Sequence, residues 1–255
     1  MITAARIKQI RSLTQKKFRK ELSLFVVEGE KAVSELLLHK NWEINHIYAL
    51  ESWLIENTIP GNIPSDRVSE KELSRISSLT TPNSVLALVN IPVWNINDIN
   101  PSGDITLMLD NIQDPGNLGT IIRTADWFGI DNIICSENTV EVFNPKVIQA
   151  SMGSFMRVKV FYTSLKKYLE NLPEPLPVMG AMLDGEDLYK TGLPGRGFLI
   201  TGNESQGISP ELVKLINRKI RIPLFHKAGK TQQPESLNAG IATGIILSHL
   251  RNYVS

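Results

Sequence analysis

Apolar positions in the first part of the chain alternate between a helical and a strand period. Ile2, Ile7, Ile10 and Leu13 recur at near-helical spacing with Lys and Arg between them, which predicts an amphipathic helix. Strands alternating with helices predict a small α/β layer structure over residues 1–90. The other elements expected there are strands at 24–27, 44–50 and 85–89, a strand ending at Val68, and helices at 15–21, 31–39, 51–57 and from Ser69, which with Glu72 has the sequence of a capping box.

Residues 91–103 have no helical period and contain two prolines and three asparagines, which indicates a linker. A second α/β series follows over residues 104–255. Its expected strands are 105–109, 132–135, 157–161, 178–182, 197–200 and 219–222, and its expected helices are 118–128, 145–152, 164–171, 210–217 and 237–251.

Composition narrows the class of protein. The chain has 255 residues, 42% of them hydrophobic and 21% charged, as in soluble globular proteins. Without a signal-peptide h-region or a membrane-spanning apolar run, the expected compartment is the cytoplasm. The single cysteine, Cys135, lies in an apolar strand and excludes an internal disulfide or a cysteine-cluster metal site, so no metal is expected.

The net charge of +1 does not predict a polyanion partner, but the distribution of charge is uneven. The first twenty residues hold seven Lys and Arg and no acidic residue. Such a cluster is either a phosphate-binding surface or an ordinary solvated helix face. The candidate RNA contacts in it are Arg11, Lys16, Lys17, Arg19 and Lys20.

Three polar segments follow apolar strands, where open α/β sheets bind ligands. In the first, Asn117 is expected to cap a helix that carries Arg123; an ordinary strand-turn-helix with an exposed arginine is the alternative. In the second, Gly202 to Gly207, Glu204 is the one carboxylate, and Ser209 is the expected cap of the next helix.

The third polar segment begins a helix at Ser236 or Asn238. That helix contains Ala239, Gly240, Ala242 and Gly244. Because each glycine inside a helix costs roughly 1 kcal/mol relative to alanine, these small residues indicate close packing against other backbone or a ligand. The sequence lacks the G-x-G-x-x-G fingerprint of dinucleotide-binding proteins and an H-E-x-x-H motif. Residues 229–231 resemble the end of a P-loop, but the first glycine of that motif is missing, so an NTPase is not expected.

Together the three segments resemble the SpoU (TrmH-like) family of RNA ribose 2′-O-methyltransferases, which carries N-x-G-x-x-x-R-x-A, G-x-E-x-x-G and I-P-[ML]…S-L-N elements in this order. The first domain looks like the family's ribosomal-protein-like RNA-binding extension, through Lys16–Arg19, Phe25–Gly29 and Lys31. The matching motif residues are Asn117, Gly119, Arg123 and Ala125; Gly202, Glu204 and Gly207; and Ile222, Pro223, Leu224, Ser236, Leu237 and Asn238.

The resemblance implies a C-terminal SPOUT domain with a deep trefoil knot and a parallel sheet flanked by helices. It also implies S-adenosylmethionine as the methyl donor, rRNA or tRNA as the substrate, and a homodimer formed through this domain. Arg123 is then the key catalytic residue. The resemblance assigns Asn117, Glu204, Ser236 and Asn238 to the same site, and the cofactor to Thr201, Gly202, Asn203, Ile222, Leu224 and Leu237.

The chain departs from the family pattern in one loop, and two functions other than ribose methylation are compatible with the sequence. Residues Phe225 to Glu235 make a longer loop than is usual in the family, either an RNA-contacting lid or a surface insertion. The chain could instead be a non-catalytic RNA-binding or assembly protein with the same fold. It could also be a knotted methyltransferase that modifies a base nitrogen.

Overall fold

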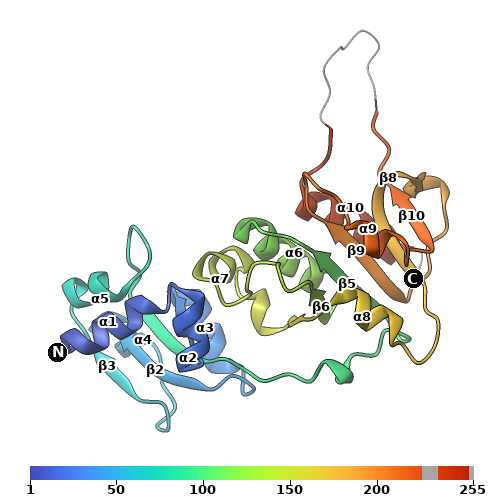
Figure 1. Cartoon of the computed structure of the whole chain (residues 1–255). Helices are drawn as coiled ribbons and strands as arrows, with labels where there is room; N and C mark the ends of the chain where they lie inside the picture. Colours follow the sequence, from blue (N-terminus) through green and yellow to red (C-terminus); the bar gives the residue numbers. More distant parts are fainter. Residues whose placement is uncertain (226–234, 253–255) are drawn as a thin grey trace. The chain divides into compact units, whose positions relative to one another are not determined.

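The computed structural model describes residues 1–225 and 235–252. Contacts divide the chain into two compact units (Figure 1). The first comprises Met1–Val93 and Glu141–Met156, and the second comprises Trp94–Val140 and Arg157–Ser255. In the described part of the chain, every helix is too short or too polar to cross a membrane.

The first unit contains a four-stranded sheet in the order β1-β4-β2-β3. β1 and β2 run antiparallel to β4, and β3 runs parallel to β2. The strands are β1 (Leu24–Glu28), β2 (Ile44–Ala49), β3 (Ser65–Arg67) and β4 (Val85–Asn90). The helices are α1 (Ala4–Ser12), α2 (Lys16–Leu22), α3 (Glu30–Leu38), α4 (Glu51–Glu56), α5 (Glu70–Ile76) and α7 (Pro145–Ser151).

The sequence pattern of this unit is confirmed in its core. Ile7, Ile10 and Leu13 are buried with residues of β1 and β4 in one hydrophobic cluster, so the apolar face of α1 covers the sheet. The capping box at α5 is also present. Ser69 Oγ accepts a hydrogen bond from the Glu72 backbone N–H, and the Glu72 carboxylate accepts one from the Ser69 N–H.

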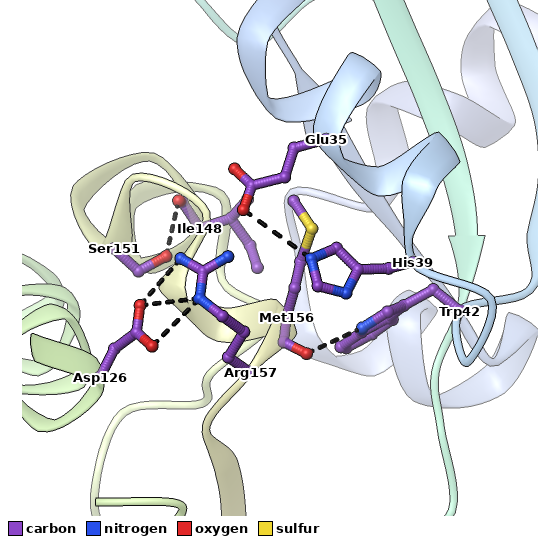
Figure 2. Close-up of polar contacts among 8 residues, drawn as sticks. All are labelled: Glu35, His39, Trp42, Asp126, Ile148, Ser151, Met156 and Arg157. Carbon is purple, nitrogen blue, oxygen red and sulfur yellow. Dashed lines mark hydrogen bonds and ion pairs between the residues drawn. The ribbon is translucent and has the colours of Figure 1, made fainter. Parts of the chain in front are cut away.

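A segment from much later in the chain completes this unit. The ring of Phe143 lies 4.5 Å from that of Phe25 on β1, and the ring of Phe155 lies 5.5 Å from that of Trp42. Trp42 Nε1 donates to the carbonyl oxygen of Met156 over 3.1 Å (Figure 2). This aromatic cluster covers β1 from the side opposite to α1. It explains why β1 is buried on both faces rather than alternating.

The second unit contains a six-stranded sheet in the order β10-β8-β9-β5-β6-β7, with every neighbouring pair parallel. This sheet confirms the expected parallel α/β architecture. The strands are β5 (Ile105–Asp110), β6 (Asn132–Cys135), β7 (Lys159–Tyr162), β8 (Val178–Asp187), β9 (Gly197–Gly202) and β10 (Arg218–Arg221). The helices are α6 (Pro115–Trp127), α8 (Leu165–Glu170), α9 (Pro210–Val213) and α10 (Ala239–Asn252).

Helix α6 starts three residues before the predicted position, and the prediction that Asn117 caps it is wrong. Asp114 is the cap: its Oδ1 accepts from the Asn117 backbone N–H over 2.8 Å, and Pro115 opens the helix. An Asp-Pro pair satisfies the geometry of a helix start better than Asn117, because proline at the first position loses no hydrogen bond. The side chain of Asn117 is therefore free for other contacts.

Helix α10 packs closely on α6, as its small residues predict. A Cβ atom on Gly240 would lie 3.0 Å from Thr120 Cγ2, and one on Gly244 would lie 3.5 Å from Thr124 Cγ2. The far end of α10 is held by Arg251, whose guanidinium pairs with Asp104 at 2.9 Å. In the same unit Arg157 pairs with Asp126 at 2.8 Å (Figure 2).

Candidate active site

The site forms where two neighbouring strands end. β5 and β9 are adjacent and parallel, and Asp110 at the end of β5 is in register with Gly202 at the end of β9. The loop after β5 leads into α6, and the loop after β9 carries Glu204. The carboxyl ends of parallel strands meet at one edge of a sheet, so the polar residues of both loops gather there.

One chain of hydrogen bonds joins all three polar segments. Asn117 Nδ2 donates to Glu204 Oε1. Asn117 Oδ1 accepts from Asn238 Nδ2 over 2.7 Å. Ser236 Oγ donates to the backbone oxygen of Glu204 over 3.3 Å. The structure therefore brings together four of the five residues that the sequence places in the catalytic group.

Asn238 also settles where the last helix begins. Its Oδ1 accepts from the backbone N–H groups of Gly240 and Ile241 at 3.0 and 3.2 Å. Asn238 rather than Ser236 is thus the cap of α10, since its amide oxygen satisfies two otherwise unpaired N–H groups. The same side chain caps a helix with its oxygen and binds Asn117 with its nitrogen.

Arg123 stands apart from this chain of hydrogen bonds. It lies on α6 and its side chain is exposed. Among the residues that the structure describes, none forms a hydrogen bond or ion pair with it. A guanidinium keeps its charge in proteins and presents a planar set of donors that suits phosphate. Arg123 is therefore available to an anionic ligand.

The residues expected to hold the cofactor lie on both sides of residues 226–234. Thr201 is buried and its Oγ1 lies 3.2 Å from Thr243 Oγ1 on α10. A Cβ on Gly202 would lie 2.4 Å from the backbone of Gly207, so only glycine fits there. The apolar side chains of Leu224 and Leu237 are 50% and 44% exposed. Apolar side chains left open beside backbone donors and acceptors suit a ligand with both apolar and polar parts.

The other two cofactor residues fit the same site. Ile222 follows β10 and is half-buried. Asn203 Nδ2 donates to the backbone oxygen of Asn111 over 3.1 Å, and its Oδ1 accepts from the Ser205 N–H. The expected lid or insertion at Phe225 to Glu235 falls on residues 226–234, which lie outside the described residues.

Two residues of this edge were not predicted from the sequence. Asp110 is buried, and its Oδ2 accepts from the Ser209 backbone N–H over 2.8 Å, so it fixes the start of α9. The Ser209 side chain, predicted to cap α9, makes no capping hydrogen bond. Asn111 has a left-handed backbone with φ of 58°. The one sequence signal for either is a polar pair at the end of an apolar strand.

The basic cluster of the first unit divides into two kinds of residue. Arg11, Lys16, Lys17 and Lys20 are exposed, as an RNA-contacting surface requires. Arg19 is different, and the expectation that it contacts RNA is wrong. Its side chain is only 2% exposed, pairs with Glu141 and donates to the Leu13 backbone oxygen over 2.8 Å. Its charge is used inside the unit and does not reach the surface.

A parallel α/β sheet with a polar site at its carboxyl edge and a second α/β unit bearing exposed basic residues are compatible with an enzyme that acts on RNA. Two family profiles agree with it. Residues 104–248 match the SpoU rRNA Methylase family, and residues 4–87 match the MRM3-like substrate binding domain. The chain belongs to the SpoU rRNA methylase family, whose members transfer a methyl group from S-adenosylmethionine to RNA.

Similar proteins cover nearly the whole chain. The 23S rRNA (guanosine 2553-2′-O)-methyltransferase RlmP of Bacillus subtilis is 30% identical and aligns over 96% of both chains. A solved structure assigned to the TrmH family of RNA methyltransferases, from Porphyromonas gingivalis, has 36% identity and a TM-score of 0.87 over 99% of both chains. An AdoMet-bound rRNA methyltransferase from Sinorhizobium meliloti has 31% identity and a TM-score of 0.86, over 100% of this chain and 97% of that one.

These findings establish the enzyme class. This protein is an S-adenosylmethionine-dependent RNA 2′-O-methyltransferase. Family membership, the cofactor and RNA as the substrate, all expected from the motifs, are confirmed.

Proposed function

We propose that this enzyme methylates the ribose 2′-hydroxyl of a guanosine in large-subunit rRNA, in the cytoplasm. The observation that carries the proposal is the hydrogen-bond chain from Glu204 through Asn117 to Asn238, which joins the three polar segments. Arg123 is exposed on α6. The choice of guanosine and of 23S rRNA follows the Bacillus subtilis relative, which aligns with both units.

The reaction is a displacement at a methyl carbon. The bond from carbon to sulfur breaks, the bond from carbon to the ribose 2′-oxygen forms, and the hydroxyl loses its proton. S-adenosylmethionine supplies the methyl group. Arg123 binds the phosphate next to the target ribose through two guanidinium N–H groups and so orients the hydroxyl. Such positioning lowers the activation barrier by several kcal/mol. That phosphate assists removal of the hydroxyl proton, which passes on to water, because the guanidinium does not deprotonate.

Asn117, Glu204, Ser236 and Asn238 act as positioning residues in this proposal. Their hydrogen bonds hold the loop after β5, the loop after β9 and the start of α10 in one arrangement. Thr201, Gly202, Asn203, Ile222, Leu224 and Leu237 hold the cofactor. Backbone groups bind its polar parts, and Leu224 and Leu237 cover its apolar parts. We place this site within a trefoil knot, and the close passage of the backbone at Gly202 supports that proposal.

The first unit binds the substrate RNA through Arg11, Lys16, Lys17 and Lys20. These exposed cations lie on α1 and α2, and they neutralise phosphates without sequence preference. The enzyme acts as a homodimer that associates through α10. Exposed apolar side chains support this: Ile241 on α10 is 55% exposed, and Tyr189, whose ring lies 5.6 Å from that of His249 on α10, is 50% exposed.

The decisive experiment maps 2′-O-methyl sites in rRNA and tRNA from cells that lack the gene, from cells complemented with the wild type, and from cells complemented with Arg123→Ala. One guanosine of large-subunit rRNA should lose its methyl group without the gene, regain it with the wild type and stay unmodified with the variant. An unchanged rRNA map together with a lost tRNA site would refute the substrate. Titration calorimetry with S-adenosylmethionine tests the non-catalytic alternative, and mass spectrometry of nucleosides tests base methylation.

The variant Arg123→Lys distinguishes the positive charge of the arginine from its ability to bind phosphate through two N–H groups. Lysine keeps the charge but cannot bind phosphate through two parallel N–H groups. We expect kcat to fall about 100-fold with unchanged binding of S-adenosylmethionine. Near-wild-type turnover of Arg123→Lys would show that the bidentate clamp is wrong.

A further inference from the structure

Three side-chain amides form a short row at the edge of the site. Gln113 Nε2 donates to Asn111 Oδ1 over 3.1 Å, and Asn111 Nδ2 donates to Gln206 Oε1 over 3.2 Å. We call Gln113, Asn111 and Gln206 the amide row. It joins the loop after β5 to the loop after β9, in addition to the bond between Asn117 and Glu204 and the bond between Asn203 and the Asn111 backbone oxygen.

The central residue of the amide row is fixed by its backbone. Asn111 adopts a left-handed conformation with φ of 58°, which asparagine tolerates better than most residues. Its N–H donates to Ser136 Oγ over 2.8 Å, and its backbone oxygen accepts from Asn203 Nδ2 over 3.1 Å. The loops after β5, β6 and β9 therefore all hold Asn111 in place, and its side chain has a defined direction.

The amide row lies next to the proposed catalytic residues along both loops. Gln113 precedes Asn117 by four residues, and Gln206 follows Glu204 by two. The carboxylates of these loops are already used. Asp114 accepts from the Asn117 N–H, and Glu204 accepts from Asn117 Nδ2. The amide row is thus a neutral group of donors and acceptors on the two loops that carry the proposed catalytic residues.

Protein stability does not explain the two glutamines. The side chains of Gln113 and Gln206 are exposed. Fixing a long exposed side chain costs conformational entropy that a solvent-accessible hydrogen bond hardly recovers. Each also has a group left over. Among the described residues, none bonds to Gln113 Oε1 or to Gln206 Nε2, so one end of the row offers an acceptor and the other a donor.

We infer that the amide row binds the base of the nucleotide that is methylated, an inference that rests on the proposed function. Amide side chains recognise bases by pairing a donor and an acceptor with the edge of a base, and unpaired RNA exposes its Watson–Crick edge. Guanine offers a partner to either end of the row: its O6 accepts from Gln206 Nε2, or its N1–H donates to Gln113 Oε1. Because the row is neutral, it selects a base without competing for phosphate.

The test uses the full-length enzyme and an RNA fragment that contains the mapped target, transcribed with guanosine or adenosine at that position. The variants are Gln113→Ala, Gln206→Ala and Asn111→Gly, since glycine keeps the left-handed backbone. Asn97→Ala, an exposed amide in the linker, is the control. We expect each row variant to lower kcat/KM for the guanosine RNA about tenfold and to reduce the preference for guanosine over adenosine. The Kd for S-adenosylmethionine and the activity of the control should not change.

Three results would overturn the inference. An unchanged preference for guanosine in both glutamine variants would show that the row does not contact the base. A parallel loss of S-adenosylmethionine binding would assign the row to the cofactor. A wild-type enzyme that does not methylate RNA at all would refute the proposed function as well, which distinguishes that failure from the first two.

Discussion

The two glycines on the face of α10 that meets α6 should respond to alanine with opposite signs. Gly244 has room: a Cβ there lies 3.5 Å from Thr124 Cγ2, an ordinary contact. Gly240 has none, because a Cβ there lies 3.0 Å from Thr120 Cγ2 and 3.2 Å from Asn238 Oδ1. The same substitution on one helix thus compares free space with close packing.

The magnitudes follow from two competing effects. Alanine is favoured over glycine inside a helix by about 0.8–1 kcal/mol, so Gly244→Ala should stabilise the protein by nearly that amount. At Gly240 the gain is offset by crowding, which costs roughly 1–3 kcal/mol when neighbours cannot move. Asn238 cannot easily move, since it binds Asn117 and caps α10. Gly240→Ala should therefore destabilise by about 1 kcal/mol.

Thermal unfolding at one fixed protein concentration and methyl transfer to RNA together test this reasoning. One kcal/mol corresponds to roughly 2–4 °C in Tm for a protein of this size, so Gly244→Ala should unfold about 2–4 °C higher and keep full activity. Gly240→Ala should unfold lower and lose activity, because it displaces Asn238. Adding Thr120→Ser, which removes the crowding methyl group, should restore part of both. If Gly240→Ala matched the wild type, close packing would not explain this glycine.

Three further substitutions or modifications probe the two units. Arg19→Met should lower the free energy of unfolding by about 3 kcal/mol in denaturant titrations because it leaves Glu141 without its buried partner, whereas Lys20→Met should change it little. The pKa of Glu72 is lowered from 4.5 to about 2, mainly by the backbone N–H groups of Ser69 and Ile2. Its contribution to stability is therefore full above pH 4.5 and lost as pH falls through about 2, so the difference in stability between wild type and Glu72→Gln should narrow over that range. Burial raises the pKa of the Cys135 thiol, so native protein should resist iodoacetamide and react only when unfolded; rapid labelling of native protein would contradict its buried position.

The sequence predicted the elements of both units well, because their hydrophobic periods are regular and many ends carry local signals. Ser69 and Glu72 marked the start of α5, and the glycines of α10 indicated close packing before its partner was known. The aromatic cluster around Phe25 was not predictable. The periods of 24–27 and 145–152 describe each element alone, and nothing in them says that Phe143 and Phe155 cover β1.

Arg19 shows why charge along a sequence does not identify a binding surface. It lies among six other cations, and only its burial beside Glu141, 122 residues later, distinguishes it. Helix α2 buries Arg19 although most of its other side chains are polar and exposed. A buried arginine needs a carboxylate from elsewhere in the fold to pair with its charge. Sequence proximity groups Arg19 with Lys17 and Lys20, while the structure separates them.

The capping of α6 by Asp114 instead of Asn117 determines what the Asn117 side chain can do in the site. Had Asn117 capped the helix, its oxygen would have been used by the backbone of its own first turn. Because Asp114 takes that role, Asn117 can accept from Asn238 and donate to Glu204 at the same time. An amide can do both, whereas aspartate can only accept and leucine can do neither. In this chain asparagine therefore suits the position, because its one amide satisfies the acceptor on Glu204 and the donor on Asn238.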